Sequence, residues 1–280
     1  IGAFSFIRMV DSKTKRAASP VNKKEFTLLG TKLVLLILLA SVYFTFFLEI
    51  SNYWAIRLQA SKLLVPVSED YSRTIFNDDY RSLQRVWLVI YSVFFAMALS
   101  LVNLKKLRNA TLANLNLLLN LTFGLSFLAL GLYELSELRH SYLNRAANEF
   151  YNVGIFVIGL RYLSLASLAA LLYINALLVK APFVLKNYAK PFQLFLHGSI
   201  LWVASSELIH WLDFLGSTQT YKLGLSILWG VYALFLVALG IWKSNQYLRI
   251  VAISLFALTL LKLFLYDVAA LNTLAKTVVF

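Results

Sequence analysis

Seven long apolar runs dominate this 280-residue sequence and leave few folds open to it. Each run is close to the roughly 20 residues that an α-helix needs to cross the hydrocarbon core of a bilayer. In lipid the backbone must satisfy its own hydrogen bonds, so such runs fold as helices. We therefore predict an all-α fold, a polytopic transmembrane bundle of repeated antiparallel hairpins. The seven full spans are expected at residues 26–48, 86–102, 112–133, 153–179, 192–211, 223–242 and 247–266.

The two ends of the chain favour a piece of a longer polypeptide. The sequence begins without Met and ends in an apolar run, 269–280, which is too short to cross and is expected to start an eighth span. Residues 1–25 carry six basic residues and no apolar run followed by a small-residue cleavage site, so we predict a basic arm rather than a signal peptide. The expected organisation is this arm, a transmembrane domain at 26–280, and one long loop at 51–85.

The composition narrows the partners and the chemistry. Hydrophobic residues make up 60% of the chain and charged residues 14%, which is too few charges for an ordinary soluble surface. The net charge of +13 does not indicate nucleic acid, because the basic residues cluster in short loops between spans, as topology and anionic headgroups require. We expect membrane lipids and other membrane subunits as partners. The absence of cysteine excludes disulfides, thiolate metal sites and a cysteine nucleophile.

The distribution of basic residues predicts the orientation. The N-terminal arm and the turns after the second, fourth and sixth spans hold 14 Lys and Arg residues, against 8 in the loops on the other side. The positive-inside rule places the side with 14 in the cytoplasm. The N-terminus is therefore expected inside, and the loops at 51–85, 137–151 and 213–222 are expected outside.

Alternate spans, the first, third, fifth and seventh, end alike, each with an acid at the boundary expected outside. The acids are Glu49, Glu134, Glu207 and Asp267, spaced by 85, 73 and 60 residues. The pattern favours a repeated helical hairpin with an irregular period. Two interpretations stay open. Either acids simply occur where helices leave the lipid, or one acid per hairpin, at one depth, lines a shared outer vestibule.

The first part of the long loop has the composition of an interfacial segment. It mixes Tyr53 and Trp54 with aliphatic residues and with Arg57 and Lys62. Trp and Tyr prefer the membrane interface, and Arg and Lys can extend their charged heads toward water. We predict an interfacial helix that ends at Pro66.

Arg161 and Lys262 lie well inside spans, where a charge is costly. Arg161 lies about 8 residues into its span, roughly 12 Å deep at 1.5 Å per residue, and Lys262 lies five residues before Asp267. In the structural interpretation both pair with helix-end acids and lock neighbouring helices. In the functional one they bind an anionic group of a lipid or glycan precursor, beside the boundary acids. We predict that Arg161 faces the bundle interior and meets Glu207, Asp267 or an anionic ligand.

Candidate catalytic residues are Glu207 and His210, which are three residues apart and so share a helical face. A carboxylate can orient a histidine that acts as a general base or proton relay. The simpler alternative is an interfacial hydrogen-bonded pair. Glu134 and Glu137 have the same spacing and could share a proton or hold a cation. A solvated helix end is the simpler explanation of this pair, and we prefer it.

The other polar residues within spans suggest packing contacts. His197 has no second histidine at its depth, as a b-type haem would need, so a polar packing contact is expected there. We expect no metal site and no cofactor, and the sequence contains no phosphate loop, dinucleotide fingerprint or serine-hydrolase elbow. Asn114, Asn116 and Asn120 crowd one half of the third span. Asparagine hydrogen-bonds between helices, so this span is expected to be enclosed by others.

The last hairpin resembles a family of bacterial membrane proteins, domain of unknown function 2339, over residues 224–272. The landmarks are Trp229–Gly230–Val231–Tyr232–Ala233, Gly240–Ile241–Trp242, Leu248–Arg249 and Leu261–Lys262–Leu263–Phe264–Leu265–Tyr266–Asp267. The resemblance implies a long, many-spanning protein of the bacterial inner membrane and cell envelope. It implies no mechanism, but it makes Lys262 and Asp267 motif positions.

Three functions remain open at this stage. The first is a protein that binds or moves a lipid-linked or anionic envelope substrate through an outer-half polar site formed by Arg161, Lys262, Asp267, Glu49 and Glu134. The second is a non-catalytic membrane subunit or scaffold, in which the same charges fix helix packing. The third is an integral membrane transferase that uses Glu207 and His210. A cavity that reaches Arg161 would favour the first and the third.

Overall fold

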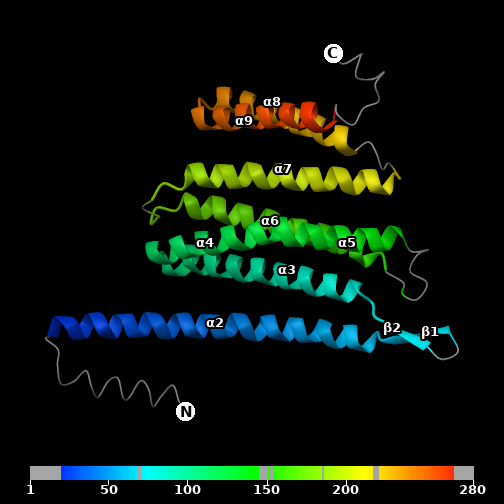
Figure 1. Cartoon of the computed structure of the whole chain (residues 1–280). Coiled ribbons are helices and arrows are strands. Elements are labelled where there is room, and N and C mark those ends of the chain that lie inside the picture. The colour runs from blue at the N-terminus through cyan, green and yellow to red at the C-terminus, as the bar shows by residue number, and fades with distance from the viewer. Residues whose placement is uncertain are drawn as a thin grey trace, which may run out of the picture. The chain divides into compact units, whose positions relative to one another are not determined.

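The computed structural model describes residues 20–68, 71–144, 151, 154–184, 186–216 and 221–267 (Figure 1). Within these residues, seven helical segments are long and apolar enough to span a membrane, which confirms the expected all-α transmembrane class. The helices are α2 (Pro20–Ala60), α3 (Asp79–Val102), α4 (Ala110–Ser126), α5 (Leu132–Leu143), α6 (Phe156–Val179), α7 (Ala189–Phe214), α8 (Tyr221–Trp242) and α9 (Gln246–Lys262). Three π-helical segments extend or join them: η1 (Asn103–Leu107), η2 (Phe127–Gly131) and η4 (Leu263–Asp267).

The chain divides into two compact units, Ile1–Ile50 and Ser51–Phe280. In the described part of the first unit, α2 exposes a continuous apolar stretch at 33–38, where each side chain is more than half exposed. A helical stretch that is apolar on every face is typical of a segment solvated by lipid. The packed core belongs to the second unit.

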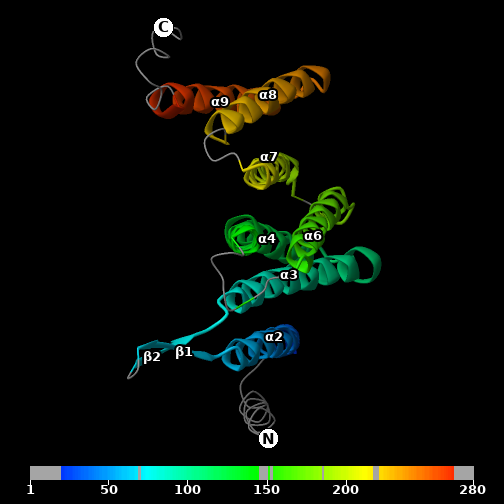
Figure 2. The same ribbon diagram turned by 90° about the vertical axis from the view of Figure 1, so that its right-hand side faces the viewer.

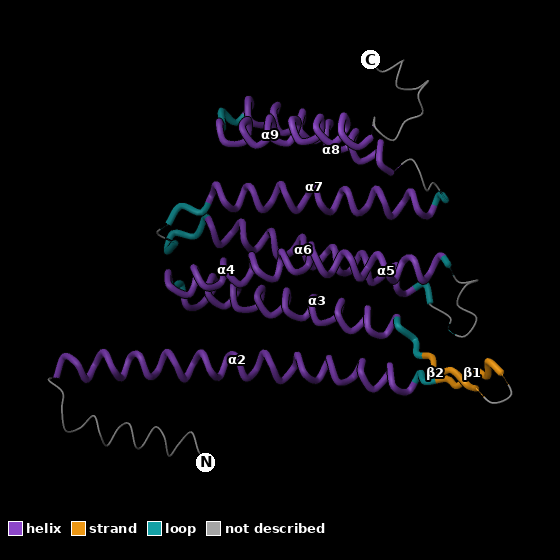
Figure 3. Tube along the Cα trace, viewed as in Figure 1, coloured by secondary structure: helices purple, strands orange, loops and turns teal. Residues whose placement is uncertain are grey.

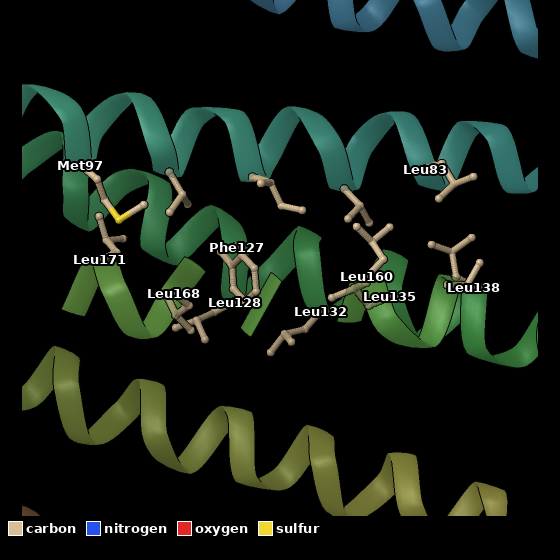
Figure 4. Packing of buried hydrophobic residues seen from close by; sticks show 14 of the residues in the cluster. Leu83, Met97, Phe127, Leu128, Leu132, Leu135, Leu138, Leu160, Leu168 and Leu171 are labelled. Carbon is tan, nitrogen blue, oxygen red and sulfur yellow. The ribbon is translucent and has the colours of Figure 1, made fainter. Parts of the chain in front are cut away.

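The core joins three spans: α3, the continuous helix formed by α4, η2 and α5, and α6 (Figure 4). On each helix the buried side chains recur every three or four residues, so they form one stripe that faces the others. Dispersion contacts between such stripes hold helices together in lipid, where apolar burial by itself provides no driving force. The stripes include Leu83, Val86, Ile90, Val93 and Met97 on α3; Phe127, Leu128, Leu132, Leu135 and Leu138 on η2 and α5; and Leu160, Leu168 and Leu171 on α6.

A second, smaller cluster joins α8 to α9 through Leu236, Leu248 and Ala252. Helix α7 contacts α5, α6 and η2 on one side and α8 on the other, so it connects the three-span core with the α8–α9 pair (Figure 2). α7 is also the least apolar of the seven spans. Its polar side chains therefore determine much of how the two groups of helices meet.

The segment between α2 and α3 differs from the expected interfacial helix that ends at Pro66. α2 continues without a break to Ala60, because residues 51–60 contain neither Pro nor Gly to interrupt it. Pro66 instead lies in strand β1 (Leu63–Ser68), which pairs antiparallel with β2 (Tyr71–Ile75) (Figure 3). In a two-stranded ribbon both strands are edges, where a residue without an N–H is tolerated.

Two of the hairpins share a turn geometry, α3–α4 and α8–α9. Each turn contains a residue with a φ of 48°, Arg108 or Ser244, followed by an extended Asn, Asn109 or Asn245, that caps the next helix. Each Asn side chain accepts a hydrogen bond from the backbone N–H three residues on, at 3.0 Å and 3.4 Å. Both returning spans then contain a π-helical segment near the boundary acid, η2 before Glu134 and η4 ending at Asp267. This shared geometry supports a structural repeat for the α3–α4 and α8–α9 hairpins.

Candidate functional site: a charged cluster between α5, α6 and α7

Five charged or titratable side chains gather near one end of the core, where α5 and α7 end and α6 begins. We call this the acidic end, and we call the group Arg139, Arg161, Glu207, His210 and Asp213 the charged cluster. Arg139 lies one turn before the end of α5, and Arg161 lies five residues after the start of α6. On α7 the three members recur every three residues, which keeps them on one side of the helix. Antiparallel packing thus brings residues that are distant in sequence to a common depth.

Arg161 is the most deeply buried charge of the cluster, with 1% of its surface exposed. Its Nε donates a hydrogen bond to Glu207 Oε1 at 2.7 Å, and its Nη2 donates to Ser206 Oγ at 2.8 Å and to the Ser206 carbonyl at 3.1 Å. The prediction that Arg161 faces the interior and meets an acid of another span is therefore confirmed. The partner is Glu207. A partner is needed because an arginine left in lipid without one would be strongly disfavoured.

The second arginine of the cluster, Arg139, forms an ion pair with Asp213 at 2.7 Å, with side-chain exposures of 8% and 34%. Sequence reasoning placed both residues in outer loops and missed this pair. The spacing in the sequence does indicate that Arg139 faces the core. It follows the buried Leu132 by seven residues and Leu135 by four, so it lies on the buried face of α5, one turn further along.

Several nitrogen atoms of the cluster are buried without a hydrogen-bond partner among the residues that the structure describes. They are Arg161 Nη1, Arg139 Nε and Nη1, and His210 Nδ1. The charges of Arg139 and Arg161 act on each other and on His210, so these atoms lie in one electrostatic environment. A buried donor without an acceptor costs about 1–3 kcal/mol. The cluster therefore has unused hydrogen-bonding capacity, most of it on guanidinium groups.

Nearly the whole chain, and not just its last hairpin, matches a known family model. Residues 7–280 match the model described as a predicted membrane protein, DUF2339. The chain belongs to the DUF2339 family. No curated protein and no solved structure matches it.

In this DUF2339 protein, Glu207 and His210 do not form the expected hydrogen-bonded dyad. Glu207 is engaged by Arg161, whereas the buried His210 ring is surrounded by aromatic rings. Its centroid lies 4.9 Å from Phe214, 5.8 Å from Trp211 and 6.5 Å from Tyr162. A histidine in this setting is held by ring contacts on α6 and α7 and lacks the carboxylate that would orient it as a base.

Lys262 lies in a different group of contacts from Arg161. Its Nζ donates to Ser226 Oγ at 2.6 Å, which joins α9 to α8. Arg161 contacts α7, so the structure does not bring Lys262 and Arg161 together. The side chain of Asp267 lies outside the described residues, and Glu49 belongs to the first unit. That the four boundary acids lie at one depth remains a prediction.

Glu134 turns away from the cluster toward α3. It is 2% exposed and is paired with Arg85, whose side chain is 59% exposed. Glu137 is exposed, so it does not share this buried environment. The two carboxylates thus do not converge on a common ligand, and in the described part of the chain no group of three His, Asp or Glu side chains is placed to hold a metal ion.

α7 is also polar on the side that contacts α8. His197 Nδ1 lies 2.9 Å from the Tyr232 hydroxyl, and Trp229 Nε1 donates to Ser205 Oγ at 2.9 Å. Gln193 of α7 forms a further polar contact, because its Oε1 accepts a hydrogen bond from Asn245, the residue before α9. The expected packing role of His197 is confirmed. Hydrogen bonds of this kind fix the rotation of neighbouring helices in lipid, where apolar faces discriminate poorly.

The asparagines of α4 are divided between interior and surface. Asn120 Nδ2 donates to Ser100 Oγ of α3 and to Asn175 Oδ1 of α6, both at 2.9 Å, and Asn116 is buried beside it. Asn114 is exposed and accepts from the Tyr188 hydroxyl. The prediction that other spans enclose this one is confirmed for the face that carries Asn116 and Asn120.

Proposed function

We propose that this membrane protein binds an anionic, lipid-linked substrate of the bacterial cell envelope at the charged cluster. The observation that supports the proposal is the set of unpartnered guanidinium nitrogens on Arg139 and Arg161, all buried among the described residues. A phosphate or carboxylate offers the acceptor oxygens that these donors lack. Arginine is suited to this role because its planar fork can pair with one acid along one edge and bind a second acceptor along another.

The two ion pairs of the charged cluster are consistent with a ligand-binding site. Glu207 and Asp213 neutralise the two arginines, which makes their burial tolerable when no substrate is bound. Arg161 uses Nε and Nη2 for its contacts on α7, and its remaining nitrogen has no partner in the described structure. A bound anion would complete the hydrogen bonding without breaking either ion pair.

The surroundings favour a ligand that approaches through the bilayer. Tyr162, Trp211 and Phe214 border the cluster beside His210 and are 43%, 56% and 37% exposed. Tyr and Trp prefer the level of the headgroups. A lipid whose chain stays in the membrane could therefore present a headgroup at the depth of Arg139 and Arg161.

The competing function is a non-catalytic membrane subunit. It is supported by the fact that each arginine already has a carboxylate partner, since such pairs can hold α5, α6 and α7 together without a ligand. The transferase alternative is less favoured, because Glu207 contacts Arg161 and not His210.

A lipid-binding measurement separates these functions. We expect the purified protein to retain a polyprenyl phosphate, detected by native mass spectrometry, in preference to the matching uncharged polyprenol. Removing one partner of a buried charge pair costs at least about 2 kcal/mol, so Arg139→Gln should weaken this binding about 30-fold or more. Arg81→Gln is the matched control, because Arg81 forms an ion pair with Asp78 in which both side chains are exposed.

Two results would favour the subunit instead. One is equal retention of the phosphate and the polyprenol by the wild-type protein. The other is an Arg139→Gln variant that folds and binds the phosphate as the wild type does.

The proposal also requires the acidic end to face outside, in the inner membrane of a bacterium. The chain has no cysteine, so single cysteines report topology directly. We expect Asp78→Cys, at an exposed position before α3, to react with an impermeant thiol reagent added to spheroplasts, and Lys105→Cys, in η1, to react only after lysis. The opposite labelling pattern would place the charged cluster on the cytoplasmic side and exclude the envelope substrate.

A further inference from the structure

We propose that a second site, separate from the charged cluster, binds a saccharide unit at the acidic end. A cavity of about 220 Å³ lies there between the end of α2 and the starts of α3 and α6. Its lining combines four aromatic side chains with three planar polar ones and a floor formed by Leu83 and Val157. The aromatic residues are Tyr53, Trp54, Tyr80 and Phe156, and the polar ones are Arg57, Asn77 and Asp79.

The aromatic side chains present ring surface to the cavity. Trp54 of α2 packs against Tyr80 of α3, with centroids 6.0 Å apart, and Tyr53 meets Trp54 edge-on at 5.3 Å. Tyr53 and Phe156 remain 51% and 54% exposed. The face of an aromatic ring carries partial negative charge. The C–H groups on one side of a pyranose ring carry partial positive charge, so sugars stack on such faces.

The polar side chains match the hydroxyl groups of a sugar. Carboxylate, carboxamide and guanidinium groups are planar and can bind two neighbouring hydroxyls at once. Asp79 is already oriented, because Ser141 Oγ donates to its Oδ2 at 3.1 Å and its backbone N–H donates to Asn77 Oδ1 at 3.2 Å. The Arg57 guanidinium lies over the Tyr53 ring, 5.4 Å from its centroid.

The charges of the lining favour a neutral ligand. Arg57 would repel an organic cation, which the aromatic rings would otherwise attract, and Asp79 would repel an anion. A polyhydroxylated ring can accept from Arg57 and donate to Asp79 at the same time. An uncharged saccharide therefore satisfies both groups, which neither type of ion does.

The segment that carries Asn77, a lining residue of the cavity, is held by contacts that do not depend on a ligand. Tyr151 donates from its hydroxyl to the Ser61 carbonyl at 2.6 Å and contacts the Ile75 carbonyl at 3.2 Å, and Asn77 N donates to Ser61 Oγ at 3.0 Å. These bonds tie the base of the β1–β2 hairpin to the end of α2. A site whose walls are fixed in advance loses less entropy when a ligand binds.

Ligand-observed NMR on the full chain in lipid nanodiscs tests the proposal, with glucose, N-acetylglucosamine and tetramethylammonium as probes. We expect saturation transfer to at least one of the two sugars and none to tetramethylammonium. Tyr53→Ala and Arg57→Ala should each weaken the sugar signal at least fivefold, and both side chains are exposed, so the fold should survive. Tyr173→Ala is the control, an exposed tyrosine on α6 sixteen residues beyond Val157.

Three outcomes would overturn the saccharide site. These are the absence of transfer to both sugars, any transfer to tetramethylammonium, and sugar transfer that Tyr53→Ala leaves at the wild-type level. The result is independent of the function proposed above, because Arg139→Gln removes a phosphate contact and should leave sugar binding unchanged.

Discussion

Replacing Arg161 by methionine lowers the stability of the protein by about 3–5 kcal/mol, the cost of leaving one member of a buried ion pair without its partner. Arg161 is 1% exposed, and its removal deprives Glu207 of a hydrogen bond of 2.7 Å in a membrane-embedded position. The measurement is the midpoint of thermal aggregation in detergent micelles, read by size-exclusion chromatography. Arg81→Met serves as the control and should change the midpoint little, since exposed ion pairs contribute about 0–1 kcal/mol.

A second substitution separates the structural role of Arg161 from binding. In Arg161→Met/Glu207→Leu both charges are gone, so most of the lost stability should return. If Arg161 also contacts the substrate, this stable double variant still fails to retain the polyprenyl phosphate. A double variant that is no more stable than Arg161→Met would show that Glu207 is not the partner that matters. A double variant that is stable and binds the phosphate normally would show that Arg161 only holds the helices together.

Replacing Asn120 by leucine lowers stability by about 1–2 kcal/mol, because two interhelical hydrogen bonds are lost and Asn175 Oδ1 loses its donor. Adding Asn175→Leu should cost less than the sum of the two single changes, since both residues belong to the same bond. The same thermal assay measures the three variants. Asn114→Leu, at an exposed position of the same helix, should have little effect. Equal losses at positions 114 and 120 would contradict the enclosed network.

The elements that sequence analysis predicted well depend on short-range properties of the chain. Seven apolar runs of bilayer length became seven spans, because in lipid a helix is the structure that satisfies its own backbone. Arg161 was predicted to face inward because of the cost of its charge in lipid. Its partner, Glu207, was one of the two acids that the prediction named beside an anionic ligand. The family resemblance, read from the last hairpin, extends over residues 7–280.

The errors and omissions concern where neighbouring elements meet. Pro66 was expected to end a helix, but α2 had already ended at Ala60 and the chain had turned into a hairpin. Arg139 and Asp213 were counted as loop charges, although they form the second ion pair of the charged cluster. Joint binding of an anion by Lys262 and Arg161 was one of two interpretations left open, and the structure gives the two residues contacts on different helices, α8 and α7 respectively.

The sequence by itself therefore determined the number of spans and the need of each buried charge for a partner, because these follow from the transfer of individual groups from water to lipid. It did not determine where the helices end, since the spans expected at 86–102 and 112–133 extend over Asp79–Leu107 and Ala110–Leu143. The tertiary structure decided which partner each charge meets. That choice depends on the rotation and register of packed helices, and a rotation by one residue, about 100°, turns a side chain to a different neighbour. For this reason the charged cluster and the aromatic cavity emerge only when the end of α2 from Ser51 onward, α3, α5, α6 and α7 are packed.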